Sequence, residues 1–292
     1  MASGSMAPDH DVAHYYDRNT SRFLRFGRAR DSYAIHRALW GPGVTTHQEA
    51  GDFINRWLAD AIRELGIPEP GSLVDLGCGV GGTLFHLAES FPESRLHGVT
   101  ISRRQVELAD RLRGSRKGGE RCRFLHGDFH SLALDLEADV VVAVESFVHS
   151  TSPEAFLHSA EAHLRPGGLL FVVDDFLAHP RDELGEAARR RIREFEAGWR
   201  LGSLCTVEEL QAAGKAAGKG RGLEAVRCSD LTHLIRPGRP RDRLIALLNP
   251  LFRRGGLVRI PFFANMIGGH ALQVGLVEGF LRYCAVVLRK PA

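Results

Sequence analysis

The chain has 292 residues, of which 44% are hydrophobic, so it can bury one large core rather than several small ones. A formal net charge of +3 is too small to indicate nucleic-acid binding. No apolar run approaches the ~18 residues needed to span a bilayer and no secretory segment opens the chain, so we expect a soluble, cytoplasmic protein. The five cysteines lack any Cys-x-x-Cys pair, which argues for reduced thiols and against a structural zinc site.

The N-terminal region, residues 7–69, is polar, aromatic and helical in pattern, and it ends at a Pro/Gly-rich turn signal. We expect a helical cap in front of a sheet, and we exclude residues 1–6 as a possible expression scar. Arg18, Arg22 and Arg25 recur at helical spacing, so their face either binds a diphosphate or is a solvent-exposed stripe. An extended N-terminal helix could also exchange between protomers of a homo-oligomer.

Residues 72–82 read Ser-Leu-Val-Asp-Leu-Gly-Cys-Gly-Val-Gly-Gly, an apolar strand, an acid and a glycine turn. Glycines lack a Cβ atom, so a ligand can approach the backbone N–H groups closely. A helix predicted over 83–90 and a strand predicted over 95–101 complete a βαβ unit. A glycine turn alone also occurs in ordinary loops, but this context favours a ligand site in which Asp75 faces a cationic group.

The elements from residue 72 to residue 178 alternate between strand and helix. Strands are predicted near 72–76, 95–100, 122–126, 138–144 and 168–175, a helix over 182–201, and two more strands over 223–232 and 283–289. This alternation predicts an α/β fold with a doubly wound, mostly parallel sheet of seven strands. The expected organisation is a cap (7–69), a core (70–178), a helical insertion or lid with the sixth strand (179–270), and a closing helix and strand (271–292).

The turn Asp-x-Gly-x-Gly-x-Gly, followed later by a Pro-Gly-Gly turn before the fifth strand, resembles the class I S-adenosylmethionine-dependent methyltransferases. The resemblance implies a Rossmann-like fold and S-adenosylmethionine as cofactor. In that family the glycine turn holds the amino-acid part of the cofactor, which implies cofactor contacts from Asp75, Gly77, Cys78 and Gly79.

Two further segments carry cofactor roles that the same resemblance implies. Most members have a ribose-binding acid where this chain has Thr100, and Thr100 and Gln105 could each take one ribose hydroxyl. Gln105 would equally suit a helix surface. Asp128 and Phe129 correspond to the acid and the apolar residue that contact adenine, although without the family the segment is a plain Asx-containing turn.

The segments Gly-x-Thr-x-Ser-x-x-Gln and Glu-x-x-x-His are similar to the subgroup that methylates carbon–carbon double bonds, which comprises cyclopropane fatty-acid synthases, sterol side-chain methyltransferases and prenyl-diphosphate C-methyltransferases. Glu145 ends an apolar strand, where a buried carboxylate needs a positive charge beside it, either the cofactor's sulfonium or a carbocation. The resemblance implies that Glu145 stabilises the cation beside the cofactor. His149 would serve as support or base, and would equally suit helix capping, while Tyr16 would close the site.

We therefore expect methyl transfer to an alkene carbon of an isoprenoid. The alternatives are O- or N-methylation of a polar natural product and a cofactor-binding protein without transfer. The expected partners are a small-molecule isoprenoid and no nucleic acid or membrane span; no metal ligands are expected in the protein, but a diphosphate substrate could bring Mg²⁺. The expected substrate-binding residues are Tyr15, Arg18, Arg22, Arg25 and Trp40, of which Trp40 equally suits the core.

Overall fold

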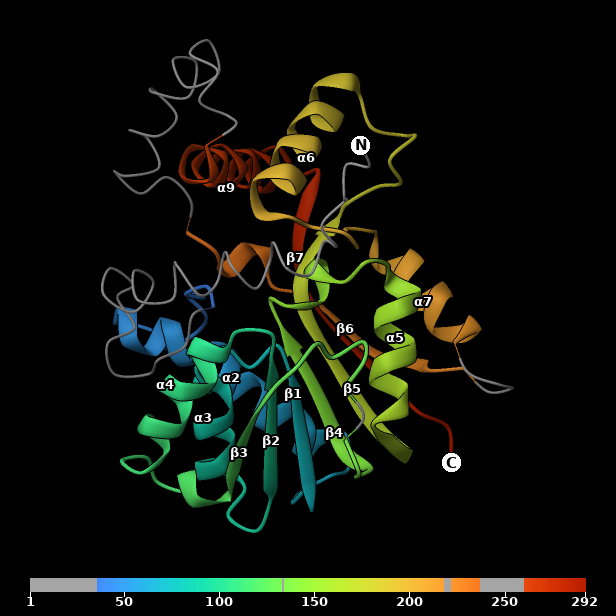
Figure 1. The fold of residues 1–292 in the computed structure, drawn as a ribbon. Coiled ribbons are helices and arrows are strands. Elements are labelled where there is room, and N and C mark those ends of the chain that lie inside the picture. The colour runs from blue at the N-terminus through green and yellow to red at the C-terminus, as the bar shows by residue number, and fades with distance from the viewer. Residues whose placement is uncertain (1–35, 133, 218–221, 237–259) are drawn as a thin grey trace, which may run out of the picture.

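Seven strands form one sheet in the order β3-β2-β1-β4-β5-β7-β6 (Figure 1). The computed structural model describes residues 36–132, 134–217, 222–236 and 260–292. The strands are β1 Ser72–Leu76, β2 Arg95–Thr100, β3 Cys122–His126, β4 Ala138–Val144, β5 Leu164–Leu177, β6 Glu224–Asp230 and β7 Leu281–Arg289. β7 pairs antiparallel with β5 and β6, and every other pair is parallel. The mostly parallel, seven-stranded, Rossmann-like methyltransferase fold expected from the sequence is confirmed.

Helices cover both faces of this sheet, with α2, α3 and α4 on one side and α5 and α7 on the other (Figure 1). The described helices are α2 His47–Glu64, α3 Gly82–Ser90, α4 Arg103–Arg113, α5 Pro153–Ala162, α6 Glu186–Trp199, α7 Val207–Ala216 and α9 Pro261–Glu278. Three short 3₁₀ turns are η1 Gly119–Arg121, η2 Phe147–His149 and η3 Thr232–Leu234. None of these helices is both long and apolar enough to cross a membrane.

The central strand β4 shows why the sequence there is an unbroken apolar run. Val141 and Ala143 pack into the core on the α5 side, whereas Val140 and Val142 pack into the core on the α2 side. Successive side chains of a strand point to opposite faces, so a strand covered on both faces must be apolar at every position. The run ends at the carboxyl end of β4, where the polar residues begin.

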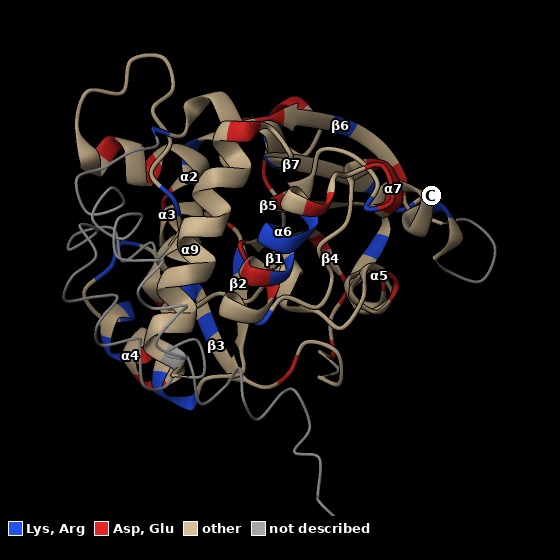
Figure 2. Ribbon diagram, turned by 90° about the horizontal axis from the view of Figure 1, so that it is seen from above, with Lys and Arg blue, Asp and Glu red and all other residues tan. Residues whose placement is uncertain are grey.

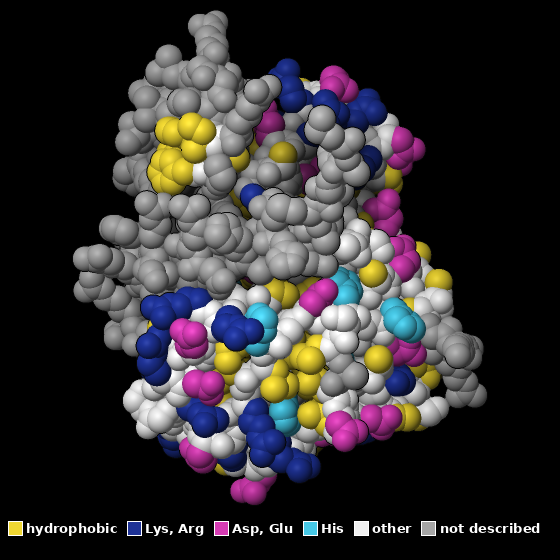
Figure 3. Space-filling model, in the orientation of Figure 1, with side chains coloured by type: hydrophobic (Ala, Val, Ile, Leu, Met, Phe, Trp, Pro, Cys, Tyr) yellow, Lys and Arg dark blue, Asp and Glu magenta, His cyan; other side chains and the backbone are white. Residues whose placement is uncertain are grey.

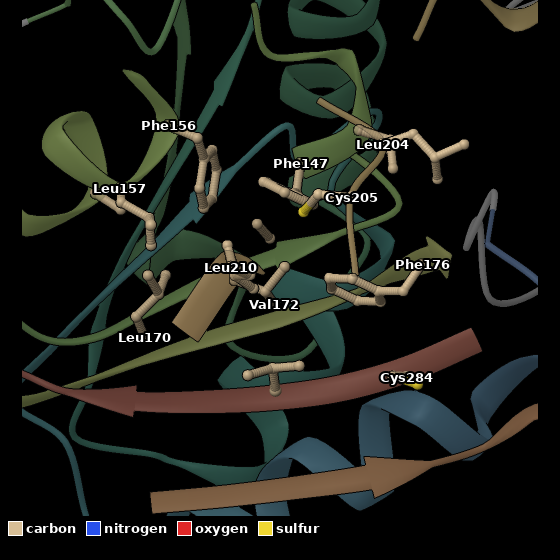
Figure 4. Close-up of a cluster of buried hydrophobic side chains, with 14 of the residues drawn as sticks. Phe147, Phe156, Leu157, Leu170, Val172, Phe176, Leu204, Cys205, Leu210 and Cys284 are labelled. Atoms are coloured by element: carbon tan, nitrogen blue, oxygen red, sulfur yellow. The ribbon is translucent and has the colours of Figure 1, made fainter. Parts of the chain in front are cut away.

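Phe147 anchors the segment that follows β4 in the core. It is fully buried, its ring stacks on that of Phe176 with centroids 5.8 Å apart, and Phe156 meets it edge-on at 5.2 Å. Figure 4 shows these rings together with Cys205 and Leu210 in one cluster. Burying a phenylalanine side chain contributes about 1.5–3 kcal/mol, so Phe147 holds η2 firmly against the sheet.

Two sequence expectations differ from the structure in detail. The Pro-Gly-Gly turn expected before the fifth strand lies inside β5, where the register shifts from Ala138↔Leu164 to Val140↔Leu169 and Gly167 has a φ of 77°. The irregularity lets the strand begin earlier than the glycines suggest. The expected division between residues 270 and 271 falls inside α9, which is one continuous helix.

Helices α6 and α9 pack along each other beyond the carboxyl ends of the parallel strands (Figures 1 and 2). Small residues allow close approach: a Cβ atom on Gly198 would lie 2.5 Å from the carbonyl oxygen of Ala264. The indole Nε1 of Trp199 donates to the Asn265 carbonyl at 3.2 Å. In Figure 2 α9 is almost entirely tan, because Glu278 is its one charged residue.

The described part of the face in Figure 3 carries basic and acidic side chains side by side in its lower part. On the surface, α4 carries local pairs of Arg104 with Glu107 and of Arg113 with Asp110. Exposed pairs of this kind contribute little to stability. The mixed signs in Figure 3 leave no extended basic surface on the described lower part of that face.

Candidate functional site

The predicted cofactor residues lie at the carboxyl ends of neighbouring strands. Asp75 is in β1, Thr100 ends β2, Asp128 follows β3 and Glu145 follows β4, and these four strands are adjacent in the order β3-β2-β1-β4. In an open parallel sheet this edge is where ligands bind, because the chain turns away to both faces there. The structure therefore brings together residues that are up to 70 positions apart.

Asp75 is a buried carboxylic acid without a basic partner among the described residues. Its side chain is 2% exposed, and burial raises its pKa from an ordinary value of 3.8 to about 7. No described basic side chain forms an ion pair with it. A positively charged ligand group would relieve the cost of ionising Asp75, which fits the ammonium of an amino-acid moiety.

The glycine turn after β1 fits closely against the end of β4. The N–H groups of Gly77 and Cys78 both donate to the Val99 carbonyl, at 2.9 and 3.0 Å, so these two amides are used within the protein. Gly77 has a φ of 101°, and a Cβ atom there would lie 2.3 Å from the Cβ of Ser146. Only glycine meets both conditions, and the turn therefore touches the residue that follows Glu145.

The turn leads directly into α3. Its N-cap is Gly81, with a φ of 87° and no side chain to accept from the first helical N–H groups. Gly79 also has a positive φ, 55°. Uncapped N–H groups at a helix N-terminus carry a partial positive charge and suit an anionic ligand group, such as the carboxylate of an amino-acid moiety.

The buried state of Asp75 predicts that cofactor binding depends on pH. The protonated acid is easier to bury than the carboxylate, so Asp75 favours the folded state most below about pH 4. This contribution is lost as the pH rises to about 7. A ligand ammonium needs the ionised acid, so affinity changes in the opposite sense. Calorimetry should show S-adenosylhomocysteine binding that weakens by up to about tenfold per pH unit below 7 in the wild type. Asp75→Asn should bind more weakly with no such slope; an unchanged slope in Asp75→Asn would exclude this role.

Thr100 and Gln105 lie together, as a shared ribose role requires. Both side chains are buried, at 5% and 4% exposure, and the Thr100 hydroxyl donates to Gln105 Oε1 at 2.6 Å. The Ser102 side chain caps α4 by accepting from the Gln105 N–H at 3.2 Å, which places Gln105 in the first turn of the helix. Gln105 is thus not a surface residue, and its amide N–H₂ donors remain for a ligand hydroxyl.

Asp128 and Phe129 follow β3 on the same edge. Asp128 Oδ1 accepts from the N–H of His130 at 2.9 Å, which closes an Asx turn. The Phe129 ring packs edge-on against Phe156 with centroids 5.8 Å apart, and its carbonyl accepts from Ser159 Oγ. Phe129 is half-buried, so one side of its ring is fixed by the core.

Glu145 has an unusual backbone and an asymmetric carboxylate. Its φ is 53°, in the left-handed region that non-glycine residues rarely adopt and that costs on the order of 1–3 kcal/mol. Oε1 accepts two hydrogen bonds, from the Arg37 N–H at 2.8 Å and from the Tyr283 hydroxyl at 3.0 Å. Oε2 accepts none from the described residues, and the side chain is 20% exposed. Within the described residues, the carboxylate is therefore held by one oxygen, and the other has no hydrogen-bond donor.

Arg37 joins Glu145 to a second carboxylate that sequence reasoning missed. Its guanidinium makes a bidentate pair with Asp175, with 2.5 Å between Nη1 and Oδ1, and lies 4.8 Å above the Tyr283 ring. Although burial alone would lower it, the pKa of Arg37 is raised by the charge and hydrogen bonds of Asp175. Arg37 is thus permanently charged, and its charge is directed first at Asp175.

The neighbouring Asp174 acts as a backbone acceptor. It is 1% exposed, and its carboxyl accepts from the N–H groups of Val148 at 3.1 Å and Asp175 at 2.9 Å. Burial, with the nearby charge of Asp175, raises its pKa well above the ordinary value. Asp174 therefore fixes η2 through its hydrogen bond to Val148.

His149 connects η2 to the C-terminal end of α6. Burial lowers its pKa, and its ring hydrogen-bonds the backbone of Arg200, the left-handed residue that caps α6. Two more bonds join the same segments, from the N–H of Gly202 and of Ser203 to the Val148 carbonyl, at 2.9 and 3.3 Å. These contacts give His149 a supporting place between η2 and the end of α6.

Trp40 contacts residues outside this carboxylate group. The Trp40 ring meets His47 edge-on at 4.9 Å, and the Arg236 guanidinium lies 4.0 Å above it. The backbone N–H of Trp40 donates to the Leu234 carbonyl. These contacts suit a packing role at the start of α2. Tyr15, Tyr16, Arg18, Arg22 and Arg25 lie outside the described residues.

Some of the missed residues carried a usable signal. Asp174 and Asp175 are consecutive acids at the end of an apolar strand, the same pattern that singled out Glu145. Tyr283 lies opposite Asp175 because β7 is antiparallel, which the sequence does not specify. Arg37 has no distinguishing pattern, since its role depends on where the segment before α2 crosses the sheet.

Comparisons with known proteins show similarity to methyltransferases. A family model described as a methyltransferase domain matches residues 74–170. The 27-O-demethylrifamycin SV methyltransferase of Amycolatopsis mediterranei is 30% identical over 204 residues, covering 70% of this chain and 71% of that enzyme. A sterol 24-C-methyltransferase of Neurospora crassa is 27% identical over 220 residues, covering 75% of this chain but only 54% of that enzyme.

Similarity in structure extends over the full length. A crystal structure of geranyl diphosphate C-methyltransferase from Streptomyces coelicolor A3(2), in complex with Mg²⁺, geranyl-S-thiolodiphosphate and S-adenosyl-L-homocysteine, matches with a TM-score of 0.67. The match covers 99% of this chain and 100% of that one at 18% identity. At this identity the likeness establishes the shared fold.

Proposed function

We propose an acceptor for this chain, which belongs to the class I S-adenosylmethionine-dependent methyltransferases: an alkene carbon of an isoprenoid, either a prenyl diphosphate or a prenylated natural product. The cofactor, when bound, supplies an electrophilic methyl group on a sulfonium. Asp75 would hold its ammonium, Thr100 and Gln105 its ribose, and Asp128 and Phe129 its adenine. The assignment of the ammonium to Asp75 is supported by the burial of this carboxyl group without a basic partner among the described residues.

The charge balance around Glu145 supports a cationic reaction centre. One guanidinium, Arg37, lies between the two carboxylates Asp175 and Glu145, and it pairs bidentately with Asp175 while its Nε stays 3.9 Å from Glu145. Asp174 lies beside them, and as a carboxylic acid whose pKa burial raises it adds no positive charge. The group thus carries a net negative charge in a largely apolar place, which favours a cationic ligand.

The proposal rests on Glu145 Oε2, the carboxylate oxygen that accepts no hydrogen bond from the described residues. Methylation of an alkene leaves a carbocation on the neighbouring carbon, and a fixed negative charge beside it lowers the barrier. Oε1 is held by Arg37 and Tyr283, so Oε2 can face that carbon without reorganising. The same oxygen is placed to accept the proton whose loss restores a double bond.

O-methylation is the second candidate, supported by the similarity to the rifamycin enzyme. That reaction needs a base for the acceptor hydroxyl and forms no carbocation, and His149 is the base it would use. The hydrogen bond between the His149 ring and the Arg200 backbone engages one of the two imidazole nitrogens, so it orients the ring and is compatible with this use. Nothing in O-methylation calls for the net negative charge at Glu145.

The substrate's remaining contacts are proposed from the sequence. Tyr15 and Tyr16 would close the site and offer aromatic faces to the cation, while Arg18, Arg22 and Arg25 would bind a diphosphate, with Mg²⁺ if the diphosphate brings it. The α6–α9 pair would serve as the lid. Trp40, through its contacts with His47 and Arg236, would support the start of α2 rather than line the isoprenoid pocket.

A product assay tests the function. The enzyme is incubated with methyl-labelled S-adenosylmethionine and prenyl diphosphates of graded length, and products are analysed by mass spectrometry after removal of the diphosphate. The proposal predicts that the label appears in a new carbon-bound methyl group for at least one chain length. Label found only in methyl ethers, when the panel is extended to polar natural products, would favour O-methylation instead.

A further inference from the structure

We infer that Arg37 and Asp175 are positioning residues for the reaction, which set the direction of the Glu145 carboxylate and tie it to the docking of residues 36–40. The inference rests on the proposed role of Glu145 toward the acceptor. It assigns no contact with substrate to Arg37, although an arginine near a diphosphate enzyme's site would usually be taken for a phosphate ligand.

The contacts of Arg37 are directed at the protein itself, and both guanidinium hydrogen bonds to described residues go to Asp175. Its guanidinium is bidentate with Asp175, its face covers the Tyr283 ring, and its backbone N–H donates to Glu145 Oε1. The side chain is 15% exposed and that of Asp175 is 2% exposed. A guanidinium paired and stacked in this way is a rigid support.

Arg37 thus fixes Glu145 by two routes. The direct route is the backbone hydrogen bond of 2.8 Å. The indirect route runs through Tyr283, whose ring packs under the guanidinium while its hydroxyl donates to the same oxygen. Both routes end on Oε1, so together they determine where Oε2 points.

The segment that carries Arg37 is itself docked just after that residue. The N–H of Leu39 donates to the Ala50 carbonyl at 2.8 Å and that of Trp40 to the Leu234 carbonyl at 2.7 Å. The Arg37–Asp175 pair is the link from this segment to β5. Breaking it removes the charge that holds the segment over the carboxyl end of the sheet.

A role in stability alone explains this ion pair less well than a role in positioning Glu145. A buried ion pair is seldom more stabilising than apolar residues of the same size, since both charges lose their hydration. Here it lies beside Glu145, which holds a strained left-handed backbone, and such strain persists where surrounding contacts over-determine it. Positioning of a reactive carboxylate accounts for both features.

The test compares Arg37→Met and Arg37→Lys with the matched control Arg111→Met on the exposed face of α4. Each variant is first checked for S-adenosylhomocysteine affinity by calorimetry and for thermal unfolding. With the acceptor that the wild type turns over best, Arg37→Met should lower kcat about 100-fold, the loss typical of a misplaced reacting group, with KM within about threefold. Arg37→Lys keeps the charge and should recover about tenfold of that loss, and Arg111→Met should match the wild type.

A pH profile separates positioning from simple destabilisation. The charged and titratable groups that face Glu145 are Arg37, Asp174, Asp175, His149 and Tyr283. Burial raises the pKa of Asp175, Arg37 lowers it and Glu145 raises it. Without Arg37, Asp175 should take up its proton at higher pH, so the acid limb of the kcat profile should move to higher pH in Arg37→Met. In the double variant Arg37→Met, Asp175→Asn that shift should vanish.

The outcomes distinguish this inference from the proposed function. If the wild type methylates only oxygen, the proposed function fails, and the same variants are then compared on that acceptor. If the wild type methylates an alkene but Arg37→Met raises KM and leaves kcat unchanged, Arg37 is a substrate ligand and the inference is overturned. A loss of kcat with an unmoved acid limb would also overturn it. Should Arg37→Met not fold, Arg37→Gln removes the same charge and carries the same kcat and pH comparison.

Discussion

Glu145→Gln is expected to lower turnover about 1000-fold while leaving the affinity for S-adenosylhomocysteine within about threefold of the wild type. Glutamine has the shape of glutamate, and its amide oxygen can accept the hydrogen bonds from Arg37 and Tyr283 that Oε1 now accepts. What is lost is the negative charge, and an N–H₂ group replaces Oε2. The measurement is single-turnover kinetics with labelled cofactor, which isolates the chemical step.

The control for this variant is Glu107→Gln on the exposed face of α4, where the carboxylate pairs only with Arg104. That pair is solvent-exposed and contributes little, so turnover and unfolding temperature should stay at wild-type values. Turnover of Glu145→Gln within about threefold of the wild type would remove Glu145 from the chemistry. A matching loss of cofactor affinity would instead make Glu145 a cofactor ligand.

Gly77→Ala should disrupt both the fold and the cofactor site. The added Cβ atom would lie 2.3 Å from Ser146 Cβ, and alanine at a φ of 101° is strained whatever space surrounds it. Ser146 cannot move freely, because its hydroxyl donates to the Leu76 carbonyl. A destabilisation of about 3 kcal/mol is expected, which lowers the unfolding temperature by about 6–10 °C. Affinity for S-adenosylhomocysteine should fall more than about tenfold as the turn shifts.

Gly66→Ala separates the two causes. Gly66 has a similar φ of 91°, but nothing lies within 4 Å of the position its Cβ atom would take. It should therefore lose only the backbone contribution, about 1 kcal/mol, and keep full cofactor affinity. Calorimetry and thermal unfolding of the two variants test this difference. Equal losses of stability and affinity in both would show that the contact with Ser146 is unimportant.

The sequence predicts the sheet well because local signals and the fold agree there. The apolar run of β4 followed by Glu145 and the glycine turn after β1 each mark the carboxyl end of a buried strand. Strand order follows from the handedness and shortness of βαβ connections, so Asp75, Thr100 and Glu145 could be expected at one edge. The structure confirms that arrangement.

The rest depends on long-range packing that no local pattern records. Arg37 is one arginine among many in the N-terminal third, and its position against Asp175 depends on how the segment before α2 crosses the sheet. Trp40 illustrates the converse, since its aromatic character suited a pocket but its partners are His47 and Arg236. Tyr283 acquires its partner Glu145 only because β7 is inserted antiparallel beside β5.

The most direct test of the account is the binding of a stable mimic of the carbocation. A prenyl analogue with an ammonium nitrogen in place of the cationic carbon is compared with its neutral carbon isostere, both in the presence of S-adenosylhomocysteine. In the wild type the ammonium analogue should bind about 100-fold more tightly than the isostere, and Glu145→Gln should abolish most of that preference. Equal affinities of the two analogues in the wild type, or a preference that survives in Glu145→Gln, would contradict a carbocation held by Glu145.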